Sequence, residues 1–297
     1  MKIVFMGYVA FSAELLKVVL SIKEADVVGV VTRKQSEFNS DFVSLEPIAK
    51  KSDIPCHFFD DSDQAQLAAW VKSLNADIIY CFGCSELLKK ILLDSAPQGV
   101  VGYHPAELPK NRGRHPIIWA LALGLKRTAS TFFMMDEGAD SGAIVSQKMI
   151  AIKNSDDAAS LYAKLVKTAK KQAVDFTQHW MKKRSKFKKQ NHRLATYWRK
   201  RTQEDGKIDW RMSSQCIYNL VRALNKPYRG AHCTDGSETI KVWKVLPAEK
   251  SPDNLEPGLV LKTAIKNKML VKCGGSDSIW LLKHEFKKMP HKGEYLK

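Results

Sequence analysis

The chain has 297 residues, of which 48 are Lys or Arg and 31 are Asp or Glu, so its formal net charge is +17. This length predicts about two domains, with enough buried surface to form cores without disulfide bonds or metals. Hydrophobic residues make up 44% of the chain, which excludes intrinsic disorder as the main state. No apolar run approaches the ~20 residues that span a bilayer, and the N-terminus does not resemble a secretory signal. We therefore expect a cytoplasmic protein without membrane contacts.

The first half of the chain alternates short apolar runs with helical patterns. Strands are predicted at residues 2–6, 26–32, 77–82, 99–103 and 130–135, and helices at residues 11–19, 67–74 and 117–125. This alternation is typical of an α/β fold, a doubly wound and mostly parallel Rossmann-like sheet. Ligands of such sheets bind beyond the carboxyl ends of the strands. We therefore expect the segments after Phe82, Tyr103 and Met135 to converge on the site.

The turn after the first strand contains one glycine, Gly7. A dinucleotide site needs several glycines there, because the backbone must approach a pyrophosphate closely. NAD is therefore not an expected cofactor.

Six cysteines are scattered through the chain and are expected to be free thiols. Cys81 and Cys84 have CxxC spacing, but no second pair or histidine cluster completes a zinc set. They follow an apolar run, so two small buried thiols are the favoured interpretation, and no metal is expected.

Residues 99–117 are the most informative segment. They predict a buried strand ending near His104, a loop with three prolines that carries Arg112 and Arg114, and then a helix. A histidine at a strand end beside a cleft is well placed for proton transfer, because imidazole titrates near neutrality. From spacing alone, a capping or core role is about equally compatible.

A second segment, residues 136–142, is an acid-rich turn that directly follows the strand predicted to end at Met135. Acidic turns are common and carry little information alone. If this turn lies beside His104, one of its carboxylates would fix the imidazole tautomer.

A long helix is predicted at residues 156–183, and a basic linker at residues 184–204. From residue 161 to residue 201 there are 14 basic residues and one acid, Asp175, so this stretch supplies 13 of the 17 excess positive charges. A high net charge first suggests nucleic acid. Because these basic residues lie at the predicted end of a helix and in a linker, they are also compatible with a solvent-exposed surface.

The last third predicts a short helix at residues 215–224, followed by strands at residues 239–245, 258–262, 268–272 and 278–282. Several short strands separated by turns favour a small β-barrel, here of OB-like type. The expected organisation is a catalytic domain over residues 1–183, the linker over 184–204 and an OB-like domain over 205–297.

With these motifs assembled, the sequence resembles the folate-dependent formyltransferases. The resemblance lies in HPAELPKNRGRHP at residues 104–116 and DEGADSG at residues 136–142, and continues in YWRKRTQEDGKIDW at 197–210 and VRALNKPYRGA at 221–231. This family includes methionyl-tRNA formyltransferase and the nucleotide-amino-sugar N-formyltransferases. The resemblance extends over nearly the whole chain.

The resemblance implies that an amine of the acceptor attacks the formyl carbon of 10-formyltetrahydrofolate. His104 matches the catalytic histidine that takes up the amine proton, and Asp140 matches the acid that supports it. The positions that match the folate site are Leu87, Leu88, Arg114, Asp136, Glu137, Gly138, Ala139 and Asp140.

One position departs from the family pattern. The family has Asn two residues before the catalytic histidine, where its amide stabilises the oxyanion, but this chain has Gly102. Losing one such donor typically costs about 10²- to 10³-fold in rate. Asn111, His115, protonated His104 or an ordered water are open candidates for a substitute donor. Ala106, where the family commonly has Ser, is a further departure.

The acceptor implied by the resemblance is a nucleotide-linked amino sugar, of pseudaminic-acid or 4-amino-4,6-dideoxy type, used for surface polysaccharides. The loop at residues 33–45 is short and carries FNSDF, as in sugar enzymes, whereas the tRNA enzyme has a longer basic loop there. Arg112 and Arg201 are candidate ligands of the diphosphate. Tyr197 and Tyr228 are candidates for the base or sugar, although core roles are at least as compatible.

Two alternatives stay open at this point. The basic stretch also suits a methionyl-tRNA formyltransferase, and loss of the Asn at Gly102 also suits a non-catalytic RNA-binding relative. Sugar enzymes of this type are commonly dimers, so a homodimer is expected.

Overall fold

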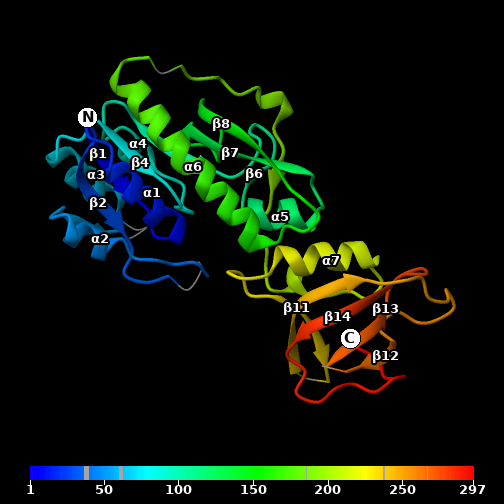
Figure 1. Cartoon of the computed structure of the whole chain (residues 1–297). Coiled ribbons are helices and arrows are strands. Elements are labelled where there is room, and N and C mark those ends of the chain that lie inside the picture. The colour runs from blue at the N-terminus through cyan, green and yellow to red at the C-terminus, as the bar shows by residue number, and fades with distance from the viewer. Residues whose placement is uncertain (37–39, 60–62, 185, 237, 266) are drawn as a thin grey trace. The chain divides into compact units, whose positions relative to one another are not determined.

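The computed structural model describes residues 1–36, 40–59, 63–184, 186–236, 238–265 and 267–297. Its first sheet has seven strands in the order β3-β2-β1-β4-β5-β7-β8 (Figure 1). The strands are β1 (Lys2–Met6), β2 (Asp26–Thr32), β3 (Cys56–Phe58), β4 (Ile78–Cys81), β5 (Val100–His104), β7 (Arg127–Met134) and β8 (Ile144–Ala151). The pairs from β3 to β5 are parallel, whereas β5 and β7 are antiparallel. The predicted α/β Rossmann-like fold is confirmed.

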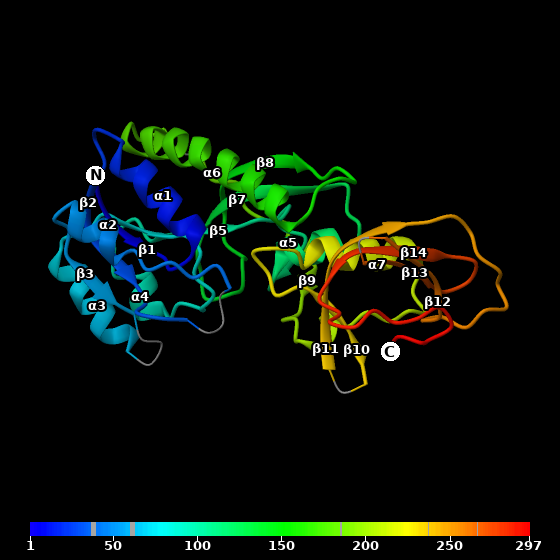
Figure 2. The same cartoon turned by 60° about the horizontal axis from the view of Figure 1, so that its bottom comes forward.

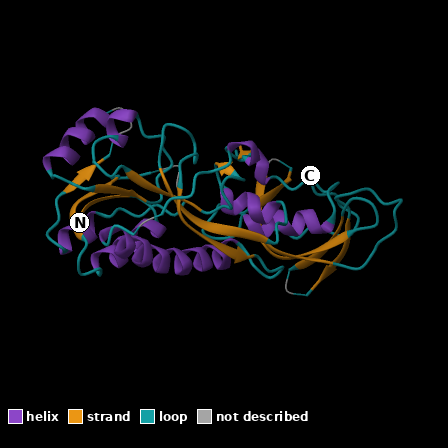
Figure 3. Cartoon of the chain, turned by 90° about the horizontal axis from the view of Figure 1, so that it is seen from above, coloured by secondary structure: helices purple, strands orange, loops and turns teal. Residues whose placement is uncertain are grey.

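Helices cover both faces of this sheet (Figures 2 and 3). They are α1 (Ala10–Leu20), α2 (Glu46–Lys51), α3 (Gln64–Ser73), α4 (Lys90–Leu93) and α6 (Ala158–Met181). A further helix, α5 (Pro116–Ala122), precedes β7 in the chain. On one face, Val4 and Met6 of β1 share a core cluster with Leu67 of α3. On the other face, Tyr80 of β4 packs against Phe176 of α6. The strands alternate between the two cores, which is why they consist of almost uninterrupted apolar residues.

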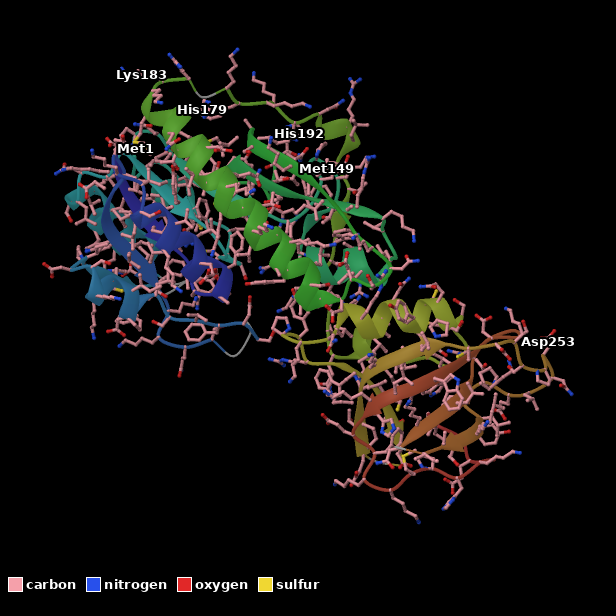
Figure 4. The ribbon with its side chains drawn as sticks, in the orientation of Figure 1. Met1, Met149, His179, Lys183, His192 and Asp253 are labelled. Atoms are coloured by element: carbon pink, nitrogen blue, oxygen red, sulfur yellow. The ribbon has the colours of Figure 1, made fainter. Side chains whose placement is uncertain are left out.

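After α6 the chain turns back along the first unit. We call residues 186–198 the return segment; Figure 4 labels Lys183 at the end of α6 and His192 on this segment. It contains a 3₁₀ turn, His192–Leu194, and the short strand β9 (Tyr197–Trp198), which pairs in parallel with β6 (Arg112–Gly113). This stretch of the expected linker is therefore part of the first unit.

By their internal contacts, the residues form two compact units. Unit 1 comprises residues 1–116, 128–151 and 163–198, and unit 2 comprises residues 117–127, 152–162 and 199–297. The expected domain boundaries at residues 183 and 205 differ from this division, because α5 and the start of α6 group with the C-terminal residues.

Unit 2 contains a 3₁₀ turn (Glu204–Gly206), α7 (Ser214–Ala223) and a five-stranded sheet of order β10-β11-β14-β13-β12. The strands are β10 (Ala231–Asp235), β11 (Glu238–Pro247), β12 (Val260–Ala264), β13 (Lys268–Lys272) and β14 (Ser278–His284). Closing a barrel would require the outer strands β10 and β12 to pair, and the described residues show no such ladder. The predicted OB-like barrel is therefore not confirmed, although the predicted strands are present.

Candidate active site

His104 is the last residue of β5, and its side chain is almost completely covered, with 4% of the residue exposed. Its Nε2 lies 2.7 Å from the carbonyl oxygen of Asn111, and its Nδ1 lies 3.5 Å from Oδ2 of Asp140. A carbonyl oxygen only accepts hydrogen bonds, so Nε2 carries a proton in this arrangement. This fixes the imidazole tautomer and turns Nδ1 toward the carboxylate.

Asp140 reaches His104 by a route that strand topology alone does not predict. Because β7 is antiparallel to β5, Met134 pairs with Val101 near the start of β5, not with its end. Met135 therefore does not end at the same sheet edge as Tyr103, although the segment that follows it reaches His104 as expected. The turn at residues 136–142, which we call the acidic turn, carries Asp140 back to His104.

The loop between His104 and α5 holds the carboxylate of Asp140. The backbone N–H of Gly113 donates to Oδ2 of Asp140 at 2.8 Å. Gly113 has φ +101°, and a Cβ at this position would lie 2.3 Å from the carbonyl oxygen of Trp198. Only glycine permits this approach of β6 to β9, so Gly113 is required for the geometry of the site.

Arg112 lies beside this loop and is only 1% exposed. Its guanidinium donates to the hydroxyl of Tyr197 at 2.8 Å and to Oε1 of Gln190 at 2.7 Å, and Nη2 lies 3.3 Å from Nδ1 of His192. In contrast to the prediction that Arg112 meets the diphosphate of the acceptor, the side chain is in the interior and its nitrogens face the return segment. The return segment covers the guanidinium through Gln190, His192 and Tyr197, which explains the difference.

Gly102, two residues before His104, faces Met135 and Phe133. A Cβ at Gly102 would lie 2.7 Å from Cγ of Met135 and 3.0 Å from Cζ of Phe133. Side chains therefore fill the space that the family uses for its Asn. This corrects the idea that the glycine leaves room for an ordered water there.

The segment at residues 82–89 follows β4 and is held by buried polar side chains. Gln64 of α3 donates to the carbonyl of Leu87 at 3.2 Å and accepts from the N–H of Lys89 at 2.7 Å. The hydroxyl of Tyr8 accepts from the N–H of Ser85 at 2.7 Å and donates to Glu86. Burial strongly raises the pKa of Tyr8, so this hydroxyl stays protonated.

The predicted folate residues differ in exposure. Leu87 is 59% exposed, whereas Leu88 is buried in the core cluster that Met135 also contacts. Asp136, Glu137 and Gly138 are exposed, and Ala139 and Asp140 are partly exposed, so the backbone of the acidic turn is accessible. Oδ1 of Asp136 accepts from the N–H of Gly138 and from the Ser141 hydroxyl, which stabilises the turn.

The other predicted ligands lie in two places. In unit 1, Arg114 is partly exposed, and Tyr197 is 62% exposed with its hydroxyl bonded to Arg112. Arg201 and Tyr228 belong to unit 2, where the Arg201 guanidinium lies 4.5 Å from the ring centroid of Trp119. The roles of these residues in binding stay predictions.

Two residues that support this site, Asn111 and Gln190, do so through contacts that were not predicted from the sequence. The backbone carbonyl of Asn111 accepts from His104, and Gln190 contacts the acidic turn. Gln190 donates to the carbonyl oxygens of Asp140 and Gly142 at 2.8 Å and 2.6 Å. Nothing in the Lys-rich stretch around Gln190 distinguishes it from a solvated residue.

Six free cysteines include Cys81, which is buried, and Cys84, which is partly buried. Burial raises the pKa of the Cys84 thiol, which disfavours the reactive thiolate. Among the described residues no three His, Cys, Asp or Glu side chains are placed to hold a metal ion, and no helix is long and apolar enough to cross a bilayer.

Residues 1–177 match the family model for formyl transferase, and residues 200–296 match that for the formyl transferase C-terminal domain. The chain belongs to the formyltransferase family. The predicted relationship to folate-dependent formyltransferases is thus confirmed, and this formyltransferase is an enzyme that transfers formyl groups.

Solved structures with the same fold include two sugar enzymes. One is WlaRD, a sugar 3N-formyl transferase crystallised with dTDP and 5-N-formyl-THF; it is 18% identical, with a TM-score of 0.68 over 94% of this chain and 96% of its own. The other is the N-formyltransferase of Helicobacter canadensis with folinic acid and dTDP-3-aminofucose, 17% identical, with a TM-score of 0.69 over 95% and 98%.

A third structure of this fold is HypX from Aquifex aeolicus in complex with tetrahydrofolic acid. It is 15% identical, with a TM-score of 0.65 over 97% of this formyltransferase. This formyltransferase spans only 44% of the HypX chain. At these sequence identities, the three similarities establish a shared fold and nothing more.

Proposed function

We propose that this enzyme transfers the formyl group of 10-formyltetrahydrofolate to the amine of a nucleotide-linked amino sugar. The observation that carries the proposal is the pair formed by His104 and Asp140, with Nδ1 of the imidazole 3.5 Å from the carboxylate. The same pair occupies the positions of the family's catalytic motif.

In this proposal the imidazole of His104 takes up the proton that the attacking amine loses. The Asn111 carbonyl keeps the other proton on Nε2. The carboxylate of Asp140 then stabilises the positive charge of the imidazolium, and the N–H of Gly113 holds that carboxylate in place. General acid and base action of this kind contributes about 10²- to 10⁴-fold to a rate.

The residues on either side of the pair suit a folate. The accessible backbone of the acidic turn supplies donors and acceptors for a pterin ring, which carries several of each. Exposed Leu87 supplies apolar surface, while the buried side chain of Leu88 leaves only its backbone for contact. When bound, 10-formyltetrahydrofolate supplies the activated formyl carbon. Arg114 is the proposed cation for its carboxylates.

The acceptor is the finer part of the proposal. It is supported by the two sugar enzymes with dTDP ligands, each of which is matched over more than 90% of both chains. In the loop at residues 33–45, residues 37–39 lie outside the described part, so its FNSDF motif supports the proposal from the sequence alone. Exposed Tyr197 is the proposed contact for the base or sugar, together with Arg201 and Tyr228 of unit 2.

One observation favours the tRNA enzyme as a second candidate. The return segment and the preceding end of α6 expose Lys182, Lys183, Arg184, Lys186, Lys188, Lys189 and Arg193. From residue 182 to residue 198 the sequence has no acid. Such a positively charged surface is compatible with binding the phosphates of RNA, and equally with exposure to solvent.

The deciding experiment is to incubate the enzyme with 10-formyltetrahydrofolate and a panel of 3-amino and 4-amino sugars linked to dTDP or UDP. We expect tetrahydrofolate release with at least one sugar and a formylated sugar by mass spectrometry. Methionyl-tRNA is assayed in parallel. Formylation of methionyl-tRNA without turnover of any sugar would overturn the proposal in favour of the second candidate, and salt-sensitive RNA binding without turnover would favour a non-catalytic relative.

A further inference from the structure

Gln190 connects three parts of unit 1 that are far apart in the sequence. Its side-chain nitrogen donates to the carbonyl oxygens of Asp140 and Gly142, and its oxygen accepts from Nη2 of Arg112. Gln190 is buried, whereas its neighbours Lys189 and Asn191 are exposed. Both N–H groups and the oxygen of this side-chain amide are thus directed at the site.

The acidic turn needs such support. Asp140 has φ +52°, a left-handed conformation that costs energy for any residue other than glycine. Its carboxylate is held by Gly113, but its backbone carbonyl is bonded by Gln190. Both contacts fix the distance between the carboxylate and His104, one through the side chain and one through the backbone.

Arg112 in turn fixes Gln190. The guanidinium is buried and lies against Gln190, Tyr197 and His192, and its Nε has no hydrogen-bond partner among the described residues. Because Arg112 can only donate, it requires Oε1 of Gln190 on its side. The amide nitrogen of Gln190 must therefore face the acidic turn.

We propose that Gln190 is a positioning residue that holds Asp140 at its working distance from His104 through the backbone of the acidic turn. The inference rests on the proposed function of that pair. It assigns the return segment a task in catalysis, although this segment is remote in sequence from the motif residues.

The test uses the full-length enzyme with three substitutions. Gln190→Glu keeps an acceptor for Arg112 but replaces the two donors with an oxygen that faces two carbonyl oxygens. Gln190→Leu removes both functions. Gln172→Leu is the matched control, because Gln172 is another buried glutamine of unit 1, which bonds Ser130 and Ser146 instead of the acidic turn.

Three quantities are measured: amide hydrogen exchange of residues 136–142, affinity for folinic acid, and kcat and KM for formyl transfer. Two lost hydrogen bonds of ordinary strength correspond to about a tenfold or larger effect. We expect both Gln190 variants to exchange about tenfold faster in the acidic turn, to bind folinic acid about tenfold more weakly and to lose kcat by at least that factor. KM for the acceptor and the exchange of β1 and β4 should stay unchanged.

Unchanged exchange and folinic acid affinity in Gln190→Glu would overturn the inference, since Gln190 would then serve only to bind Arg112. An equal loss in Gln172→Leu would also overturn it, because any buried glutamine would then have the same effect. The exchange measurement needs no ligand or acceptor. If the wild type transferred formyl to no amino sugar, the proposed function would fail, while the exchange of the acidic turn would still decide the role of Gln190.

Discussion

The side chain of Met135 occupies the place into which any side chain at position 102 would point, since a Cβ at Gly102 would lie 2.7 Å from Cγ of Met135. Met135 is also in contact with two core clusters, one with Leu88 and one with Leu108. The absence of an Asn at position 102 and the packing of Met135 are therefore linked. In the proposed mechanism the oxyanion requires a donor other than a side chain at position 102.

This relationship predicts the outcome of restoring the family residue. Gly102→Asn alone should destabilise unit 1 by about 1–3 kcal/mol, because it adds atoms to a packed core, and should not raise kcat. Gly102→Asn combined with Met135→Ala should fold normally and raise kcat by about tenfold or more. Urea unfolding and tetrahydrofolate release measure the two effects, with Met135→Ala as the control. A stable and faster Gly102→Asn single variant would contradict the packing argument.

The proton-transfer pair predicts a difference between two substitutions. His104→Ala should lower kcat by at least about 10²-fold, because among the described residues His104 is the imidazole beside Asp140. Asp140→Asn retains an oxygen that accepts from Gly113, so the fold should be intact while kcat falls by a similar factor. Circular dichroism and the midpoint of thermal unfolding check the fold. Retention of more than a tenth of the wild-type kcat by His104→Ala would rule out the assigned base.

Arg112 and Arg114 are separated by one residue, and their substitution should affect different properties of the enzyme. Arg112→Leu should destabilise unit 1 by about 2–4 kcal/mol, because it leaves Gln190 and Tyr197 with unsatisfied polar groups. Arg114→Leu should change stability by less than about 0.5 kcal/mol, since its side chain is partly exposed, but should weaken folinic acid binding. Both are measured by urea unfolding and by titration with folinic acid. Equal stabilities would show that the Arg112 contacts do not stabilise the enzyme.

The stability of unit 2 should depend on pH through Asp205. Hydrogen bonds from Arg199 and from the N–H of Thr202 hold the pKa of this carboxyl well below its usual range. A carboxyl with a depressed pKa stabilises the fold above its unfolded value of about 3.9, and this stabilisation is lost as the pH falls below that value. Asp205→Asn should therefore destabilise unit 2 by about 1–3 kcal/mol at pH 7. The difference from wild type should shrink steadily below about pH 4.

The matched control for this effect is Asp209→Asn. A hydrogen bond from Arg211 lowers the pKa of Asp209 to about 2, yet 44% of the Asp209 side chain is exposed. Exposed ion pairs contribute little because water and salt screen them. Only 14% of the Asp205 side chain is exposed. If Asp209→Asn shifted the urea midpoint as much as Asp205→Asn at pH 7, this lower exposure of Asp205 would not be the cause.

Much of the α/β fold follows from the sequence. The strand at residues 2–6 and the helix that begins near residue 158 were predicted to within about two residues, because continuous apolar runs and a long amphipathic stripe are strong signals. Asp157 and Ser160 bond each other's backbone N–H groups at the start of α6, a local capping pattern that a sequence can carry. The motifs also predicted His104 and Asp140 as a pair, and the two side chains lie 3.5 Å apart.

The rest of the site could not be predicted, for physical reasons. The pairing of Arg112 with Tyr197 joins positions 85 residues apart, and a two-residue strand pair has no periodic signal. The antiparallel direction of β7 depends on the length and path of the chain before it, and Asn111 contributes only a backbone carbonyl. Met135 packs over Gly102, where there is no side chain to prevent it. An apolar sequence pattern does not show the direction of this packing.

The chain passes between unit 1 and unit 2 five times, after residues 116, 127, 151, 162 and 198. Consider a chimera in which all residues after α6 come from a related enzyme. It would combine the C-terminal sheet of the relative with α5 and residues 152–162 of this enzyme. Contacts such as those of Arg222 with the carbonyls of Lys153 and Asp156 would then be made between mismatched partners. Unit 2 is therefore not a detachable C-terminal module in this enzyme. Recombination between relatives must exchange three segments together to keep unit 2 intact.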